Sequence, residues 1–391
     1  MSLRSSALVL AAALLTRAMP LAIGVLVATF FGPSDYADTV LMITAANLCG
    51  SLPMLAVTPL ILRSPDDALA TWLARRGVAL GLPLILVAAL LVSPVLNLVG
   101  NWVFLFCYSA AVFVFGVAQT LHNQRLDNLR ALFHATAVTA AALFAAVATY
   151  LAGGAVGLVV NALAATMLAA SLLSFALIRA GAKPQPRPHF ASGALNALWS
   201  GLFSLLVIAG LFISASRARH AGDPDGYVAF SLGLQVFSIV VFIPGAMSGY
   251  FIPKLVRAGA ETGARVGPAV RAYLLLAVPA FCAAVALSPL FFRYLEQPPQ
   301  PRLIAIFALI QFAAVLAAVN AAYNQVLVAS GRFATLAMLS AGWLLTLVGV
   351  LWLRGDQTIW IAAAIALAYA ALVFASRHAC RSAWPRRKEL A

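Results

Sequence analysis

Residues 303–323 read LIAIFALIQFAAVLAAVNAAY, and this stretch decides the class of the protein. It contains no charged side chain, and the two amide side chains within it are Gln311 and Asn320. An α-helix needs about 20 mostly apolar residues to cross the hydrocarbon core of a bilayer. The stretch therefore predicts a membrane-spanning helix that carries two uncharged polar groups.

The rest of the chain has the same character. Of its residues, 63% are hydrophobic and 9% are charged, whereas a soluble domain has about 25% charged residues. Backbone polar groups cannot face lipid unpaired, so long apolar runs of this kind indicate an all-α integral membrane bundle. We predict twelve transmembrane helices, near residues 6–30, 38–62, 77–98, 102–121, 131–152, 155–178, 194–215, 227–251, 272–292, 303–323, 333–353 and 358–376.

The positions of the basic residues predict the orientation. If both termini are cytoplasmic, 19 of the 25 Lys and Arg residues fall on the cytoplasmic side and Arg17 lies within a span. Such an asymmetry is the positive-inside signal, and it explains the net charge of +14 without nucleic-acid binding. We therefore expect a multi-pass protein of a bacterial inner membrane. The outer side holds the remaining five, Arg217, Arg219, Arg293, Arg302 and Arg354.

A proline-rich cytoplasmic linker divides the chain into two similar parts. We predict an N-terminal six-helix lobe (1–178), a linker (179–193), a C-terminal six-helix lobe (194–376) and a basic tail (377–391). Gly32 and Asn123 have counterparts 190 and 201 positions later in Gly222 and Asn324, and both second spans contain prolines. Paired repeats with broken helices often enclose a transport site. Alternatively, the prolines only kink their helices.

Several segments resemble the multidrug/oligosaccharidyl-lipid/polysaccharide (MOP) exporter superfamily, which includes O-antigen translocases and the lipid II flippase. They are Leu15-Thr16-Arg17 with residues 28–36 (ATFFGPSDY), residues 241–245 (VFIPG) with 251–255 (FIPKL), and residues 329–333 (ASGRF). The resemblance implies two six-helix lobes in a V around a cavity that opens alternately to either side. It also implies an undecaprenyl-linked saccharide as cargo.

The chain departs from the lipid II flippase pattern in two respects. That protein has two further C-terminal spans, and it carries additional arginines in its first two spans, where only Arg17 matches here. We therefore expect an undecaprenyl-pyrophosphate-linked O-antigen or exopolysaccharide unit as cargo, with lipid II as an alternative. The expected partners are this lipid-linked sugar, membrane lipids and other polysaccharide-assembly proteins.

Arg17 is the first candidate for substrate binding. An arginine at the centre of a membrane helix costs about 2.5–3.5 kcal/mol, so it is expected to face water or a partner. Its fork of donors suits the pyrophosphate of a polyprenyl-linked sugar. Alternatively, Arg17 snorkels, or it pairs with a carbonyl freed by Pro20.

The other candidates are two arginines and four amides. Arg217 and Arg219, at the outer end of the seventh span, either extend a cationic lining or serve as interfacial anchors paired with Asp223 and Asp225. The amides either bind sugar hydroxyls or join helices by hydrogen bonds. They are Asn47, Gln235, Gln311 and Asn320.

The acidic residues bear on the alternative functions. All eleven fall in loops or at span edges, unless Asp38 lies deeper than its predicted position. A proton- or sodium-coupled drug exporter normally needs a carboxylate within the membrane, so this distribution counts against that alternative. Short outer loops argue against an enzyme, and no Walker motif or Cys/His metal spacing predicts a cofactor or metal.

Overall fold

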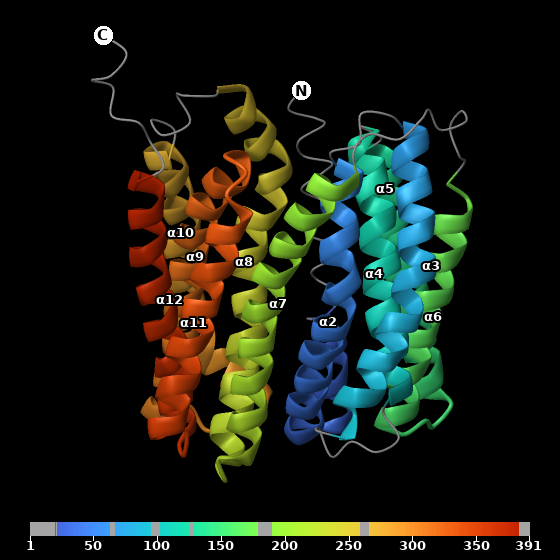
Figure 1. The fold of residues 1–391 in the computed structure, drawn as a ribbon. Helices are drawn as coiled ribbons and strands as arrows, with labels where there is room; N and C mark the ends of the chain where they lie inside the picture. The colour runs from blue at the N-terminus through green and yellow to red at the C-terminus, as the bar shows by residue number, and fades with distance from the viewer. Residues whose placement is uncertain are drawn as a thin grey trace. The chain divides into compact units, whose positions relative to one another are not determined.

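The computed structural model describes residues 20, 22–62, 67–94, 102–125, 128–178, 190–258 and 266–382 (Figure 1). The secondary-structure elements of this part of the chain are all helices, and ten of them are long and apolar enough to cross a membrane. The twelve-helix prediction is confirmed. The helices are Ala22–Phe31, α2 (Pro33–Leu62), α3 (Asp67–Val92), α4 (Trp102–Gln124), α5 (Asn128–Leu151), α6 (Val156–Ala176), α7 (Phe190–His220), α8 (Pro224–Ala258), α9 (Val266–Tyr294), α10 (Pro301–Ala329), α11 (Phe333–Arg354) and α12 (Thr358–Ser382).

The chain forms two compact units, residues 1–212 and 213–391, and the boundary between them in the sequence falls within α7. In the first unit α4 is the central helix and packs against α2, α3 and α6. Of the residues in the apolar stretch of α4, 72% are buried, compared with 22% of those in α3. The approach of α2 to α4 is close because Gly50 lies against the backbone of Ser109, whose hydroxyl donates a hydrogen bond to the Ala46 carbonyl at 2.7 Å.

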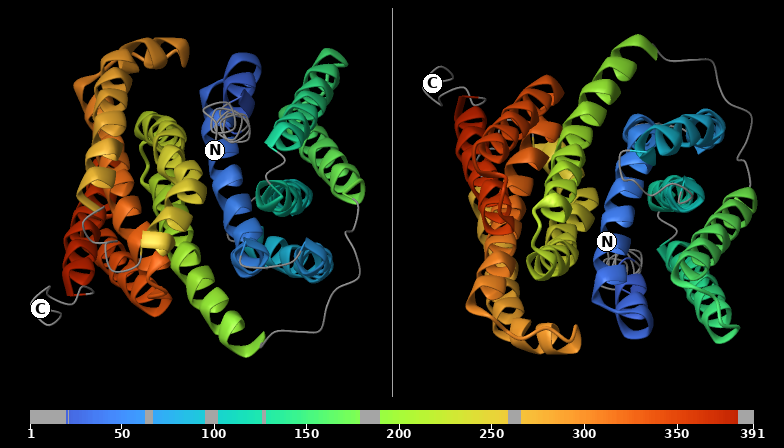
Figure 2. Two further views of the ribbon diagram at one scale, coloured as in Figure 1. Left: turned by 90° about the horizontal axis from the view of Figure 1, so that it is seen from above. Right: turned by 90° about the horizontal axis from the view of Figure 1, so that it is seen from below.

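The second unit repeats this arrangement six helices later. Its central helix, α10, packs against α8, α9 and α12, and α11 packs against α12 as α5 does against α6 (Figure 2). The Gln311 side chain on α10 donates a hydrogen bond to the Gly233 carbonyl on α8 at 2.8 Å. Gln311 and Gly233 follow Ser109 and Ala46 in the sequence by nearly the offsets that the repeat predicts. The two units therefore share both their topology and an interhelical contact.

The turns that precede α2 and α8 also match. Gly32 and Gly222 adopt positive φ values of +104° and +68°, which favour glycine because it lacks a Cβ. Both helices then begin at a proline, a residue whose fixed φ suits the first helical position. Tyr36 and Tyr227 are buried one turn later. The Gly-Pro-Tyr similarity in the sequence therefore reflects one local structure used twice.

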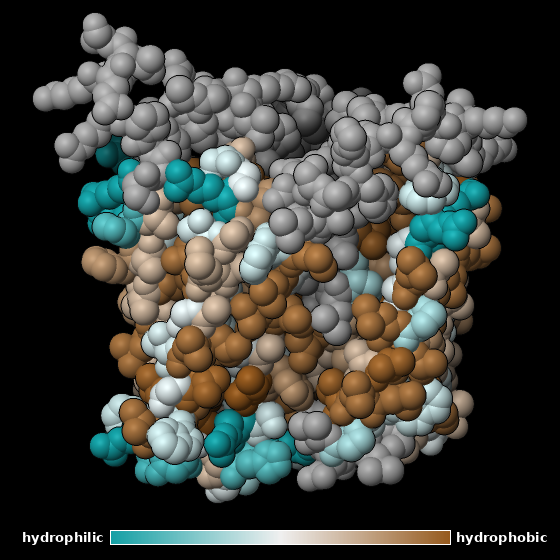
Figure 3. All heavy atoms as spheres, viewed as in Figure 1, coloured by the Kyte–Doolittle hydropathy of each residue, from teal (hydrophilic) through white to brown (hydrophobic). Residues whose placement is uncertain are grey.

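Large apolar side chains are exposed along the middle of the outer helices. In Figure 3 they form a brown band, with teal side chains near the helix ends. Such a surface is unfavourable in water and is the one that lipid would cover. Aromatic residues at helix ends, including Trp102, Tyr294 and Trp360, are also exposed, as in the interfacial belts of membrane proteins. The exposed apolar residues include Leu80, Leu91, Phe133, Phe144, Leu275, Leu345 and Phe374.

Candidate functional site

The structure places the predicted substrate-binding residues at several depths. Arg17 lies outside the described residues. Asn47 is half-buried on α2, Arg217 is exposed near the end of α7, and Arg219 is half-buried two residues later. The remaining three amides are all buried in the second unit, Gln235 on α8 and Gln311 and Asn320 on α10.

Gln311 and Asn320 have unsatisfied acceptors on opposite faces of α10. They are nine residues apart, which is about two and a half helical turns. The Gln311 amide donates to the Gly233 carbonyl, but neither its Oε1 atom nor the Oδ1 atom of Asn320 has a hydrogen-bond partner among the described residues. A buried acceptor of this kind needs a donor from water or a bound molecule. The two side chains thus belong to different environments and do not form one constellation.

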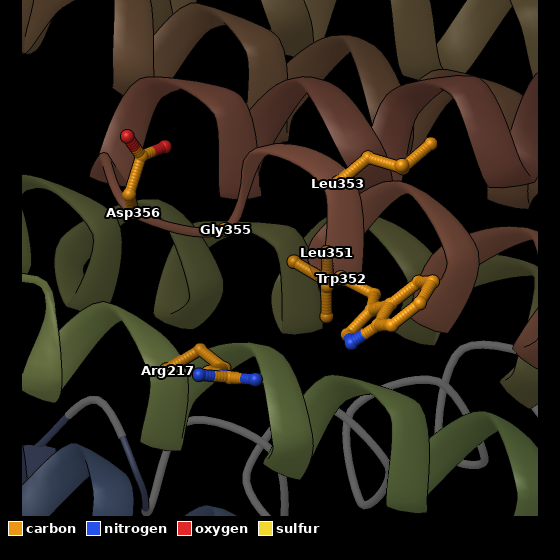
Figure 4. A pocket seen from close by; sticks show the side chains of 6 residues that line it. All are labelled: Arg217, Leu351, Trp352, Leu353, Gly355 and Asp356. Carbon is orange, nitrogen blue, oxygen red and sulfur yellow. The ribbon is translucent and has the colours of Figure 1, made fainter.

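The acids that follow the C-terminal end of α7 have partners other than Arg217. Asp223 forms an ion pair with Arg302 at 2.5 Å, and the Gln297 amide donates to Asp225 at 3.1 Å. These bonds join the start of α8 and the turn before it to the start of α10 and the segment before it. Arg217 instead lines a surface pocket at the end of α11 (Figure 4).

Asp38 lies deeper in its helix than any other described acid. Because α2 begins at Pro33, Asp38 lies in its second turn, where it is half-buried. The other acids of the described residues lie in the first turn of a helix or outside a helix. One turn earlier, partial burial raises the pKa of Asp35, and the nearby Asp38 carboxylate raises it further. The N-terminal end of α2 thus carries two interacting carboxyl groups.

Two groups of buried polar residues were not anticipated as partners. The Tyr273 hydroxyl on α9 donates to the Gln325 side chain at 2.9 Å, and the Gln325 amide donates to the Pro244 carbonyl at 3.0 Å. The Gln325 side chain is 5% exposed and joins three helices. In the sequence its signal is an Asn-Gln pair that occurs in both repeats, at residues 123–124 and 324–325.

The second group is a pair of histidines in the first unit. His122 on α4 and His134 on α5 are both buried, and their ring centroids are 6.0 Å apart. Their spacing in sequence gave no sign of this contact. Among the described residues no group of three or more His, Cys, Asp or Glu side chains is placed to hold a metal ion.

Comparisons with known proteins connect this arrangement to transporters. No protein-family model matches the chain, and no curated protein sequence matches it. Among solved structures, an inward-facing multidrug resistance MATE family transporter of the MOP superfamily superposes with a TM-score of 0.68 at 16% identity, covering 94% of this chain and 95% of that one. The outward-facing conformation gives 0.67 at 16% identity, covering 97% and 96%.

A MATE transporter in complex with the molecule MaD3S gives a TM-score of 0.68 at 17% identity, covering 97% of this chain and 95% of that one. At such low identity the similarity concerns the arrangement of the helices, which agrees over nearly the whole of both chains. The chain therefore has the fold of the MATE transporters of the MOP superfamily.

Proposed function

We propose that the protein is a flippase that moves an undecaprenyl-pyrophosphate-linked oligosaccharide across the membrane by alternating access. The observation that carries the transport part is the similarity to both an inward-facing and an outward-facing structure of one fold. In this mechanism residues 1–178 rock against residues 194–376 about the 179–193 linker. The lipid tail stays in the bilayer while the head group crosses.

The choice of an anionic cargo rests on the distribution of charge. The chain carries Arg17 in its first predicted span and a net charge of +14. The acids of its described part lie at or near helix ends, so a cationic substrate would find little complementary charge deep in the membrane. The unsatisfied acceptors of Gln311 and Asn320 would suit sugar hydroxyls, which donate hydrogen bonds.

The direct test is translocation in proteoliposomes of purified full-length protein. A fluorescent undecaprenyl-pyrophosphate oligosaccharide placed in one leaflet is expected to become accessible to a membrane-impermeant quencher on the other side. Protein-free liposomes and an unlabelled lipid-linked competitor are the controls. Failure to move this lipid, combined with export of cationic dyes against an ion gradient, would show that the proposed cargo is wrong while the fold stands.

Arg17→Ala is expected to slow this translocation about tenfold or more, since a charge-assisted hydrogen bond contributes about 1.5–3 kcal/mol. Arg17→Lys keeps the charge but not the bidentate fork, so an intermediate rate is expected. Arg271→Ala, at an exposed position near the start of α9, is the matched control. A native rate in the Arg17→Ala protein would exclude the pyrophosphate contact.

An ion-coupled multidrug exporter is the second candidate, and the depth of Asp38 favours it. If the protein is a flippase, Asp38→Asn is expected to leave translocation unchanged, because the carboxylate then only stabilises the N-terminal end of α2. In an exporter the same substitution removes a relay carboxylate and abolishes dye export driven by a proton or sodium gradient. Asp35→Asn, one turn earlier, controls for loss of charge.

A further inference from the structure

A pocket of about 360 Å³ lies at the end of α11, within the second unit. Its volume is in the range of about 300–1,000 Å³ that is typical of small-molecule sites. Arg217 lines it from α7, Trp352 from the last turn of α11, and Asp356 from the turn that follows, with the Asp356 carboxylate pointing away from Arg217 (Figure 4). Leu351, Leu353 and Gly355 complete the lining.

The two charged side chains of this pocket are opposite in sign, yet they do not pair. No hydrogen bond or ion pair joins Arg217 or Asp356 to each other or to another residue in the described part of the chain. Elsewhere the protein does pair such groups, as in Arg125–Asp67 and Arg302–Asp223. The pocket therefore presents a separate cation and a separate anion to whatever enters it.

The surroundings of the pocket are those of a membrane interface. Trp352 is 82% exposed and Leu353 is 73% exposed, although both are large and apolar. Tryptophan is enriched at the headgroup level of membrane proteins, where its ring meets lipid and its N–H meets polar groups. A molecule bound here thus has its polar part at Arg217 and Asp356 and an apolar part beside these two side chains.

We propose that this pocket binds the headgroup of a zwitterionic ethanolamine phospholipid. Arg217 binds the phosphate, for which a guanidinium provides a planar set of donors, and Asp356 binds the ammonium group. An anionic phospholipid would satisfy Arg217 but would leave its phosphate near an unpaired carboxylate. The proposal also gives Arg217 a role as an interfacial lipid anchor, apart from the transported cargo.

Native mass spectrometry of the delipidated full-length protein tests this directly and does not depend on transport activity. Phosphatidylethanolamine, phosphatidylglycerol and soluble glycerophosphoethanolamine are added separately. The native protein is expected to retain phosphatidylethanolamine best. Arg217→Gln is expected to weaken the binding of phosphatidylethanolamine and of phosphatidylglycerol about tenfold, because it removes one charge-assisted contact.

Asp356→Asn provides the sharper result, because it is expected to weaken the binding of phosphatidylethanolamine and to strengthen the binding of phosphatidylglycerol. A misfolded variant cannot gain affinity in this way. Arg354→Gln is the matched control, since Arg354 lies outside the pocket lining and over the Trp360 ring. Preference of the native protein for phosphatidylglycerol, unchanged retention in Arg217→Gln, or equally tight binding of glycerophosphoethanolamine would overturn the proposal.

Discussion

A Gly50→Ala variant is expected to be markedly less stable than the native protein, and a Gly50→Leu variant is expected not to fold. A Cβ added at Gly50 would lie 2.8 Å from the backbone oxygen of Ser109 and 3.3 Å from its Cα. Because these are backbone atoms, no side-chain rotation can relieve the overlap, and α2 must move away from α4. Overpacking of this kind typically costs about 1–3 kcal/mol.

Thermal unfolding in detergent, followed by size-exclusion chromatography, measures this effect. Gly157→Ala on α6 is the matched control, since nothing lies within 4 Å of the Cβ that it would add. Ser109→Ala removes the hydroxyl that bonds to the Ala46 and Leu105 carbonyls, and hydrogen bonds between membrane helices average about 0.6 kcal/mol. A melting temperature in Gly50→Ala equal to that of Gly157→Ala would contradict the close approach of α2 and α4.

The second large effect is expected from Gln325→Leu. This substitution removes the two hydrogen bonds that Gln325 makes with the Tyr273 hydroxyl and the Pro244 carbonyl, and each contributes about 0.5–1.5 kcal/mol. We expect a lower melting temperature for the second unit. The bond from the Gln325 amide to the Pro244 carbonyl also joins α10 to α8, so its loss removes an interhelical contact.

A double-mutant cycle with Tyr273→Phe separates this network from simple loss of packing. If the hydroxyl bonds to Gln325, the two substitutions are expected to be non-additive, with the double variant less damaged than the sum. Tyr323→Phe, at a half-buried position on α10, is the control. Strict additivity would show that the two side chains do not interact in the folded protein.

The helices could be predicted from the sequence because their apolar runs exceed the thickness of a bilayer. Their ends were less predictable: α3 begins at Asp67, ten residues before the predicted span. The span prediction counts apolar residues, so it excluded Arg75 and Arg76. A helix, however, continues through charged residues once it reaches the polar side of the membrane. The sequence left the depth of Asp38 open for the same reason, since α2 begins five residues earlier than expected.

The candidate site was harder to predict because its contacts join distant segments. Arg217 and Asp356 line one pocket although they are 139 positions apart, and helices that are apolar on every side show no period to indicate which face meets which. Individual polar residues within spans could be identified from composition alone. Whether each one has a partner depends on the packing of three helices, as Gln325 shows.

The six-helix unit has a consequence for how such a chain could arise. Each crossing reverses the side on which the polypeptide emerges, so six crossings return it to the side where it began. A gene for one unit could therefore be copied in tandem and joined end to end, and the second copy would insert in its original orientation. A unit with an odd number of crossings would have been inverted by the same event, and its basic loops would have had to be redistributed before it could insert.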